Sequence, residues 1–266
     1  MTQILFGLIR QFQQWEPTAQ IGFGLARLMM IPFAIVARTG PEGIRLPATV
    51  GVIVLVIVSQ GIFMWANRGM VTTLGRAQRD YRNGDFEAAV GVLESLRNDE
   101  NADYRVLTLL GNTYRQLGQL EESEAVLYEA VNISPDHYFP HYGFGRTLLI
   151  GGHYQEAISH FEQALEYAAP SGVRFDLGEA LYRYGDFASA LEQFRLVQGV
   201  KNIEDYRLLM AVYVLCKAQE SAPPDSDLIE SGLPYWKNVA RLYADTLYGE
   251  AVLRDIESIT ALNREG

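Results

Sequence analysis

The chain has 266 residues, of which 48% are hydrophobic, and its formal net charge at pH 7 is −10. This acidic balance argues against a general nucleic-acid binder, which would carry a basic face. A single cysteine, Cys216, allows no internal disulfide, so no disulfide framework holds the fold.

Residues 1–14 have the pattern of a short amphipathic helix. Their large apolar residues fall on one helical face: Ile4, Leu5, Leu8, Ile9 and Phe12. Trp15 follows, and Pro17 ends the run. One interpretation is a helix that lies at a membrane surface, with Trp15 at the level of the lipid headgroups. The other is a helix packed on a protein neighbour.

Residues 19–37 form a second apolar stretch, which holds Arg27 at its middle and Pro32 beyond it. An arginine at mid-span costs about 2.5–3.5 kcal/mol on insertion scales. The stretch is therefore either a second span whose Arg27 meets a partner, or a helix lying in the membrane interface. If it spans, residues 38–47 would be the tight loop of a helical hairpin.

Residues 48–66 are predicted to be a transmembrane helix. These 19 residues contain no charge and are bounded by Arg45 and Arg68. At about 1.5 Å per residue they span roughly 28 Å, close to the thickness of the hydrocarbon core. We therefore expect a membrane anchor here, preceded by membrane-associated helices over residues 1–47. No break signal other than Gly69 follows, so we expect the helix to continue to about residue 81.

The arginines around the anchor predict its orientation. Arg68, Arg76, Arg79 and Arg82 follow it, whereas Arg38 and Arg45 precede it. Under the positive-inside rule, the part of the chain after the anchor lies on the cytoplasmic side.

A turn signal then returns at a fixed interval. Gly84, Gly118 and Gly152 are 34 residues apart, and Gly185 follows after 33. A sustained period of this length indicates stacked supersecondary units. Each glycine can take the left-handed conformation that ends a helix.

Small and large residues recur in phase with the four turn glycines. A small residue lies seven positions before each glycine, namely Ala77, Gly111, Gly145 and Gly178. Another lies five positions after it, and an apolar residue follows four later: Ala89 and Leu93, Ser123 and Leu127, Ala157 and Phe161, Ala190 and Phe194. The small residues let two helices approach closely, and the large residues fill the space beside them.

This pattern resembles the tetratricopeptide repeat, a pair of antiparallel helices in 34 residues. The second copy matches best, with Leu107, Leu110, Gly111, Tyr114, Ala130 and Pro135 in the places that the family uses. The first copy has Asn101 in place of the closing proline, and the third has His141 where the family usually has tryptophan. The resemblance implies an all-α helical-hairpin solenoid with four repeats over residues 67–200.

After the fourth copy the phase is lost. Residues 205–218 read as one more helix, Pro223 and Pro224 break the chain, and residues 234–262 hold periodic apolar side chains. A stack of repeats needs an atypical end to close its last apolar face. We expect residues 201–266 to be that helical cap.

The sequence offers no catalytic site. All four histidines fall between His137 and His160, but in repeat phase they have different structural roles, which argues against a metal site. We find no phosphate-binding loop, nucleophile elbow or functional carboxylate pair, so we expect neither an enzyme nor a cofactor.

The resemblance implies a concave groove lined by the first helix of each repeat. The twenty family groove positions hold five arginines and one acid, Glu179, although residues 68–200 hold 11 arginines and 19 acids. Ten of these positions are our candidate partner-binding residues: Tyr81, Arg82, Arg105, Asn112, Arg115, Tyr142, Arg146, Phe175, Tyr182 and Arg183.

Arginine binds carboxylates bidentately and stacks on aromatic rings. The groove is therefore predicted to bind an acidic or carboxylate-bearing peptide of a protein partner. The alternative is that these arginines pair with acids of the same solenoid.

Two functions fit these features. The first is a membrane-anchored scaffold that recruits or organises protein partners through its groove and contacts lipid through its N-terminal helices. The second is an accessory or assembly subunit of a larger membrane complex, held mainly by those helices. Arg27 within an apolar stretch favours the second, because such a charge needs a protein partner.

Overall fold

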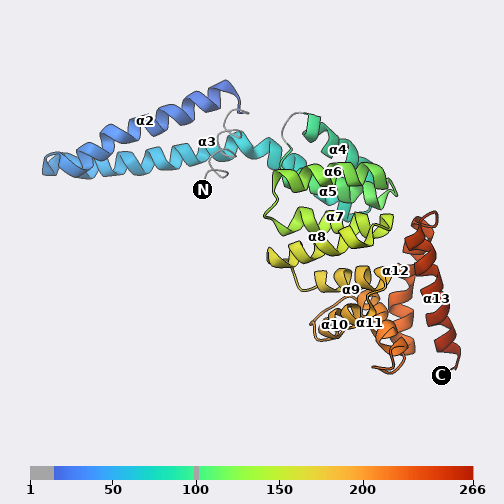
Figure 1. The fold of residues 1–266 in the computed structure, drawn as a ribbon. Coiled ribbons are helices and arrows are strands. Elements are labelled where there is room, and N and C mark those ends of the chain that lie inside the picture. The colour runs from blue at the N-terminus through green and yellow to red at the C-terminus, as the bar shows by residue number, and fades with distance from the viewer. Residues whose placement is uncertain (1–14, 99–101, 266) are drawn as a thin grey trace. The chain divides into compact units, whose positions relative to one another are not determined.

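The computed structural model describes residues 15–98 and 102–265. The amphipathic helix predicted for residues 1–14, and Asn101, lie outside these ranges. Within them the chain forms helices α2 to α13 and no strand (Figure 1). The chain divides into two compact units, residues 1–76 and 77–266.

The first unit contains α2 (Pro17–Thr39) and most of α3 (Glu42–Arg82). The two helices pack at glycines: a Cβ added to Gly22 would lie 3.4 Å from Ile62, and one added to Gly51 would lie 2.4 Å from Phe33. Trp15 packs edge-on against Phe63. This is a helical hairpin whose loop is shorter than the predicted 38–47, because only Gly40 and Pro41 separate the helices.

The early start of α3 explains the short loop. Pro47 lies inside the helix rather than before it. A proline there removes one helical hydrogen bond, and the helix tolerates this loss. The helix then continues to Arg82 without a break, in agreement with the continuous helix expected past Gly69.

Both helices of the hairpin are apolar on their outer surfaces. Segments Pro17–Thr39 and Glu42–Ala66 have mean hydropathies of 1.6 and 2.2, and each is long and apolar enough to cross a membrane. Only 11% of the apolar 18-residue stretch within each segment is buried. Large apolar side chains such as Ile21, Leu28 and Ile57 are about two-thirds exposed, at 62%, 63% and 64%.

The second unit is a stack of helix pairs. After the last turn of α3 come α4 (Phe86–Asn98), α5 (Tyr104–Gln116), α6 (Leu120–Ile133), α7 (Tyr138–Gly151), α8 (Tyr154–Glu166), α9 (Val173–Tyr184) and α10 (Phe187–Gln198). From α4 onward each helix packs on the next, and the first helices α5, α7 and α9 also contact one another in sequence (Figure 1). The all-α solenoid expected from the repeats is therefore confirmed.

The turns between paired helices have the predicted left-handed glycines. The φ angles are +80° at Gly84, +77° at Gly118, +86° at Gly152 and +97° at Gly185. A residue with a Cβ is strained there. These glycines end the first helix of each pair and let the second helix return beside it.

The predicted pairing of small and large residues is also confirmed. A Cβ on Gly111 would lie 2.4 Å from Leu127 Cγ, and one on Gly145 would lie 2.8 Å from a ring carbon of Phe161. Gly178 packs in the same way on Phe194, with a closest approach of 3.1 Å. All three large side chains are fully buried. The missing side chain on one helix therefore makes room for the large side chain on its partner.

Three helices follow the fourth pair: α11 (Asp205–Lys217), α12 (Ser226–Leu242) and α13 (Leu247–Glu265). Helix α11 packs on α10, and α12 packs on α11. Pro234, where the sequence suggested a new helix, lies inside α12. Helix α13 packs on α12 and also contacts α7, so the end of the chain turns back along the first helices (Figure 1).

Two histidines given separate roles by the sequence pattern lie side by side. The Nδ1 atoms of His141 and His160 are 2.9 Å apart, and His141 Nε2 lies 2.8 Å from the Pro135 carbonyl oxygen. With Nε2 of His141 donating to this carbonyl, its Nδ1 is left to accept from Nδ1 of His160. Within residues 15–98 and 102–265, no group of three or more His, Cys, Asp or Glu is placed to hold a metal ion.

Replacing Gly111 with alanine should destabilise the full chain by about 1–3 kcal/mol, because the new methyl group would overlap Leu127. Gly91 is the matched control: it lies within α4, and a Cβ there meets no atom within 4 Å. Gly91→Ala should be neutral or stabilising, by up to about 1 kcal/mol. Urea unfolding in detergent, followed by helical circular dichroism, measures both. Equal stability of the two variants would contradict the close approach of α5 and α6.

The histidine pair should make stability fall in mild acid. Burial, and secondarily the neighbouring His141, lower the pKa of His160 from 6.5 to about 4. Between these values the unfolded chain binds the proton and the folded chain does not, so this contribution to stability is lost as the pH falls from about 6.5 to 4. His160→Gln should make the pH dependence of the melting temperature shallower over this range.

The exposed His153 provides the control for this experiment, since His153→Gln should leave the wild-type pH dependence unchanged. Carboxylates contribute equally in all three chains, so the comparison isolates the histidine pair. A His160→Gln profile parallel to the wild-type profile would show that the pair does not titrate with folding.

Candidate partner-binding face of the repeats

The ten candidate residues lie on four first helices. Tyr81 and Arg82 end α3, while Arg105, Asn112 and Arg115 belong to α5, Tyr142 and Arg146 to α7, and Phe175, Tyr182 and Arg183 to α9. We call the surface formed by these helices the first-helix face. Helix α5 contacts α7, and α7 contacts α9, so eight of the ten candidates lie on three neighbouring first helices.

Arg115 is buried within this face, with 3% of its surface exposed. Its Nη1 donates to Asn112 Oδ1 at 2.7 Å, and to the Gly143 carbonyl oxygen on α7 at 3.1 Å. Burial and the nearby Arg146 lower the pKa of Arg115. No carboxylate neutralises it among the described ion pairs, so α5 and α7 are joined by a buried charge held on neutral acceptors.

Arg146 and Arg207 share one buried acid. Arg146 Nε lies 3.4 Å from Asp176 Oδ1, and Arg207 Nη2 lies 3.6 Å from Asp176 Oδ2. The Asp176 side chain is only 3% exposed. Tyr142 donates to the same carboxylate at 3.2 Å. Helices α7, α9 and α11 are therefore joined by charge as well as by apolar contact.

The side chain of Arg183 is also buried, with an exposure of 4%. Its Nη1 pairs with Asp255 of α13, and its Nη2 lies 3.6 Å from Glu179. Burial raises the pKa of Glu179, and Tyr248 of α13 donates to that carboxylate at 2.8 Å. Two acids from different helices thus face one guanidinium.

Helices α12 and α13 cover the part of the first-helix face that holds Arg115, Arg146 and Arg183. The repeat pattern did not predict this packing. The Tyr243 hydroxyl, at the end of α12, donates to the Arg115 carbonyl oxygen at 2.9 Å. Arg146 Nη2 donates to the Tyr235 hydroxyl at 3.2 Å. Phe175 is 1% exposed and packs against Trp236 of α12, so it belongs to the core.

One sequence signal could have revealed this packing. Asp255 lies beside Ile256 and three residues after Val252, on the same stripe of α13 as the apolar side chains. An acid on an apolar stripe must find a partner when it is buried. The arginines of the fourth repeat were the available partners.

The candidates nearest the start of the stack remain accessible. Arg82 is exposed, and its Nε donates to the Gln78 carbonyl oxygen. Arg105 is 60% exposed in its side chain and pairs with the neighbouring Asp103. Tyr81 is half-buried and packs on Phe86. The arginines are therefore buried within the chain at one end of the face and exposed at the other.

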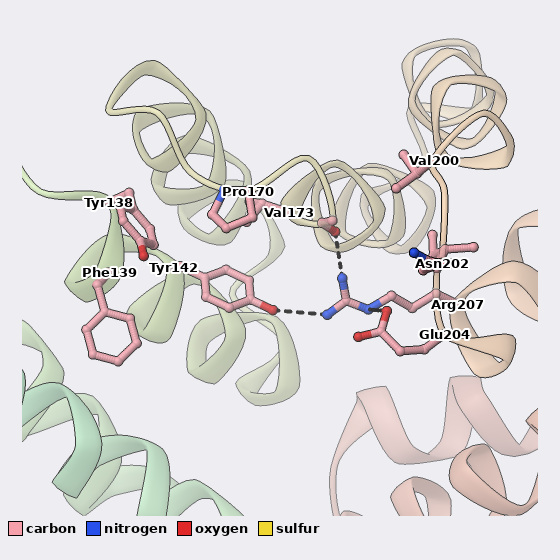
Figure 2. A pocket seen from close by; sticks show the side chains of 11 residues that line it. Tyr138, Phe139, Tyr142, Pro170, Val173, Val200, Asn202, Glu204 and Arg207 are labelled. Carbon is pink, nitrogen blue, oxygen red and sulfur yellow. Dashed lines mark hydrogen bonds and ion pairs between the residues drawn. The ribbon is translucent and has the colours of Figure 1, made fainter. Parts of the chain in front are cut away.

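A pocket of about 410 Å³ opens at the edge of the first-helix face. Tyr138, Phe139 and Tyr142 form one wall, and the segments before α9 and α11 form the other (Figure 2). Figure 2 shows Arg207 crossing the floor, where it donates to the Gly172 carbonyl oxygen at 2.8 Å and to the Tyr142 hydroxyl at 3.2 Å. The volume of this pocket lies within the range of small-molecule binding sites.

Comparison with known proteins supports the repeat assignment. Two family models, each described as tetratricopeptide repeat, match residues 103–169 and 142–201. No curated protein matches the chain with significance.

Solved structures with a similar arrangement include three forms of MamA. MamA (residues 41 to the end) from Desulfovibrio magneticus RS-1 is 18% identical with a TM-score of 0.49, covering 65% of this chain and 94% of that one. MamA MSR-1 is 22% identical with a TM-score of 0.47, covering 65% and 95%. MamA AMB-1 is 21% identical with a TM-score of 0.47, covering 70% and 98%. The two family models therefore assign residues 103–201 of this chain to tetratricopeptide repeats, in agreement with the helix pairs from α5 to α10.

Proposed function

We propose that this chain is a membrane-anchored scaffold that recruits or organises protein partners through its tetratricopeptide repeats. The observation that carries the proposal is the presence, in one chain, of the repeats and of two consecutive helices with apolar outer surfaces. Repeat solenoids present extended surfaces to partners. The anchor would hold that surface beside the membrane, on the cytoplasmic side if the arginines after the span follow the positive-inside rule. Such a role needs no catalytic residue and no cofactor.

The anchor can be tested by placing charge on its outer surface. Val54 and Ile57 are 50% and 64% exposed near the middle of the 48–66 segment. Changing both to arginine should release most of the chain from membranes washed with alkaline carbonate, because each arginine costs about 2.5–3.5 kcal/mol at mid-span. Tyr184→Arg with Phe187→Arg is the control: these side chains of the solenoid are 54% and 58% exposed. Retention of the Val54 and Ile57 variant in the washed membrane would rule out this segment as the anchor.

The part of the face that supports binding of an acidic peptide is its accessible end. Arg82 and Arg105 are exposed, whereas Arg115, Arg146 and Arg183 already have partners in the chain. Asp103 is a weak competitor for Arg105, since an exposed ion pair contributes at most about 1 kcal/mol. A partner carboxylate can therefore replace it at little cost.

Charge reversal at both exposed arginines should weaken partner binding. We expect the Arg82→Glu, Arg105→Glu chain to retain less than a tenth of the partners that the wild type captures from membranes in mild detergent, because two charge-assisted contacts are lost. The matched control reverses Arg241 and Arg254, two exposed arginines of α12 and α13. Helicity and melting temperature should be the same in all three chains. Equal capture by both variants would exclude recruitment through this end of the face.

The alternative function is a subunit of a larger membrane complex, held by its N-terminal helices. Arg27 favours it: the side chain is exposed on α2, with its guanidinium 5.0 Å from the centre of the Phe23 ring. A charge at that depth in a bilayer requires a polar neighbour. Another subunit could supply one.

Exchange of residues 1–66 for an unrelated two-span anchor separates the two functions. The scaffold should keep its partners after the exchange, whereas the subunit should lose them. The measurement is again capture in mild detergent, with Arg27→Leu as a second variant. The subunit function would replace the scaffold function if both changes abolish capture of the partners. In that case, charge reversal at Arg82 and Arg105 should leave capture intact.

A further inference from the structure

Helix α13 presents one regular stripe to the solenoid. Helix α13 holds five residues at i, i+4, i+7, i+8 and i+11, and none of these residues is more than 6% exposed: Tyr248, Val252, Asp255, Ile256 and Ile259. Side chains at this spacing lie on one face of a helix. The opposite face is solvent-exposed, with Leu247 at 71% and Leu253 at 51%.

The stripe makes polar contacts that match the candidate residues of α9. Asp255 pairs with Arg183 and accepts from the Tyr182 hydroxyl at 3.1 Å. Tyr248 donates to Glu179 at 2.8 Å, seven positions before Asp255. The Arg183 guanidinium also lies 5.6 Å from the centre of the Tyr248 ring. A tyrosine and an aspartate two turns apart on one helix therefore contact three polar side chains of the repeats, Glu179, Tyr182 and Arg183.

This arrangement has the form of a helix bound in a groove. In that mode an amphipathic helix lays its apolar face on a partner, with anchors at i, i+4 and i+7. Here Val252, Ile256 and Ile259 belong to the buried core, in which α13 packs on α12 and contacts α7, while Tyr248 and Asp255 set the register against α9. Four residues, 243–246, join α13 to α12, on which α13 also packs.

We propose that α13 is an internal ligand of the first-helix face, and that the same face accepts from a protein partner an amphipathic helix with this chemistry. The partner helix carries an aspartate for Arg183 and Tyr182, and a tyrosine seven residues earlier for Glu179. This inference rests on the proposed scaffold function and names the partner segment for the fourth repeat. It is independent of the exposed arginines at the start of the stack.

The polar contacts favour exchange between equivalent helices. Removing water from a buried ion pair costs about as much as the pairing returns, so the net gain is small while the demand for an acid is strict. An incoming helix that supplies the acid can replace α13 contact for contact. The tether gives α13 an effective concentration of about a millimolar, so a competitor must bind more tightly or be held nearby.

The test uses a fluorescent peptide with the sequence of residues 243–265 and the full chain in detergent. In the wild type the tethered α13 should keep the peptide out. In the Asp255→Lys chain, lysine repels Arg183, so the peptide should bind at least tenfold more tightly than to the wild type by fluorescence anisotropy. A second peptide, in which the Asp255 position is lysine, should bind neither chain.

Equal and weak binding of the two peptides to the Asp255→Lys chain would overturn the proposal. So would a wild-type dimer by light scattering that exchanges α13 between copies, since the occupant would then be a second copy rather than a partner. Neither result bears on capture through Arg82 and Arg105, so the scaffold function can stand or fall separately.

Hydrogen exchange on the wild-type chain gives a result even if Asp255→Lys fails to fold. An exchangeable ligand opens without the rest of the stack, so the amides of α13 should exchange at least tenfold faster than those of α7 and α9. Protection of α13 equal to that of α9 would make it part of the permanent core, and would overturn the inference.

Discussion

The packing of the repeats depends on the hydrogen bonds and ion pairs of the guanidinium groups that are buried on the first-helix face. Arg115, Arg146 and Arg183 follow each other along α5, α7 and α9, and a charge removed from water is tolerated only when it is paired or hydrogen-bonded. Each arginine bonds to an acceptor on the next first helix or on the C-terminal helices. Apolar burial brings the helices together, but these contacts set which residue faces which.

The spacing of the helices was readable from the sequence because its cause is local. A tight turn needs a residue in the left-handed conformation, and the close approach of two helices needs a small residue. Gly118 and Gly111 therefore predict a helix pair from the local sequence alone. The same steric rule repeats every 34 residues and therefore stands out from chance. The loop of the N-terminal hairpin was predicted too long for a related reason: Pro47 signals an end, but a helix can accept it in its second turn.

The packing of α12 and α13 over the first-helix face could not be predicted in this way. The hydrogen bonds of α12 and α13 to the first helices join residues 69 to 128 positions apart, such as Tyr248 with Glu179 and Tyr243 with Arg115. Periodicity shows that α13 has an apolar stripe, but not which surface receives it. Counting charges by groove position made every arginine look available, whereas contacts within the chain bury three of the five. Of these three, Arg146 and Arg183 pair with acids of the same chain, as the alternative left open by the sequence expected, but Arg115 bonds to neutral acceptors. The exposed Arg105 also pairs with an acid, Asp103.

Internal pairing divides the face into two parts with different chemistry. At the start of the stack, Arg82 and Arg105 are exposed, so an acidic segment gains charge contacts there without displacing a helix. At the fourth repeat the charges are balanced by Asp255 and Glu179, so attraction of a free acid is weak and shape decides. A chain with a net charge of −10 repels acidic partners at long range. In the proposed function, recruitment by charge is therefore confined to the exposed arginines, and recognition at the fourth repeat would require a helix that can take the place of α13.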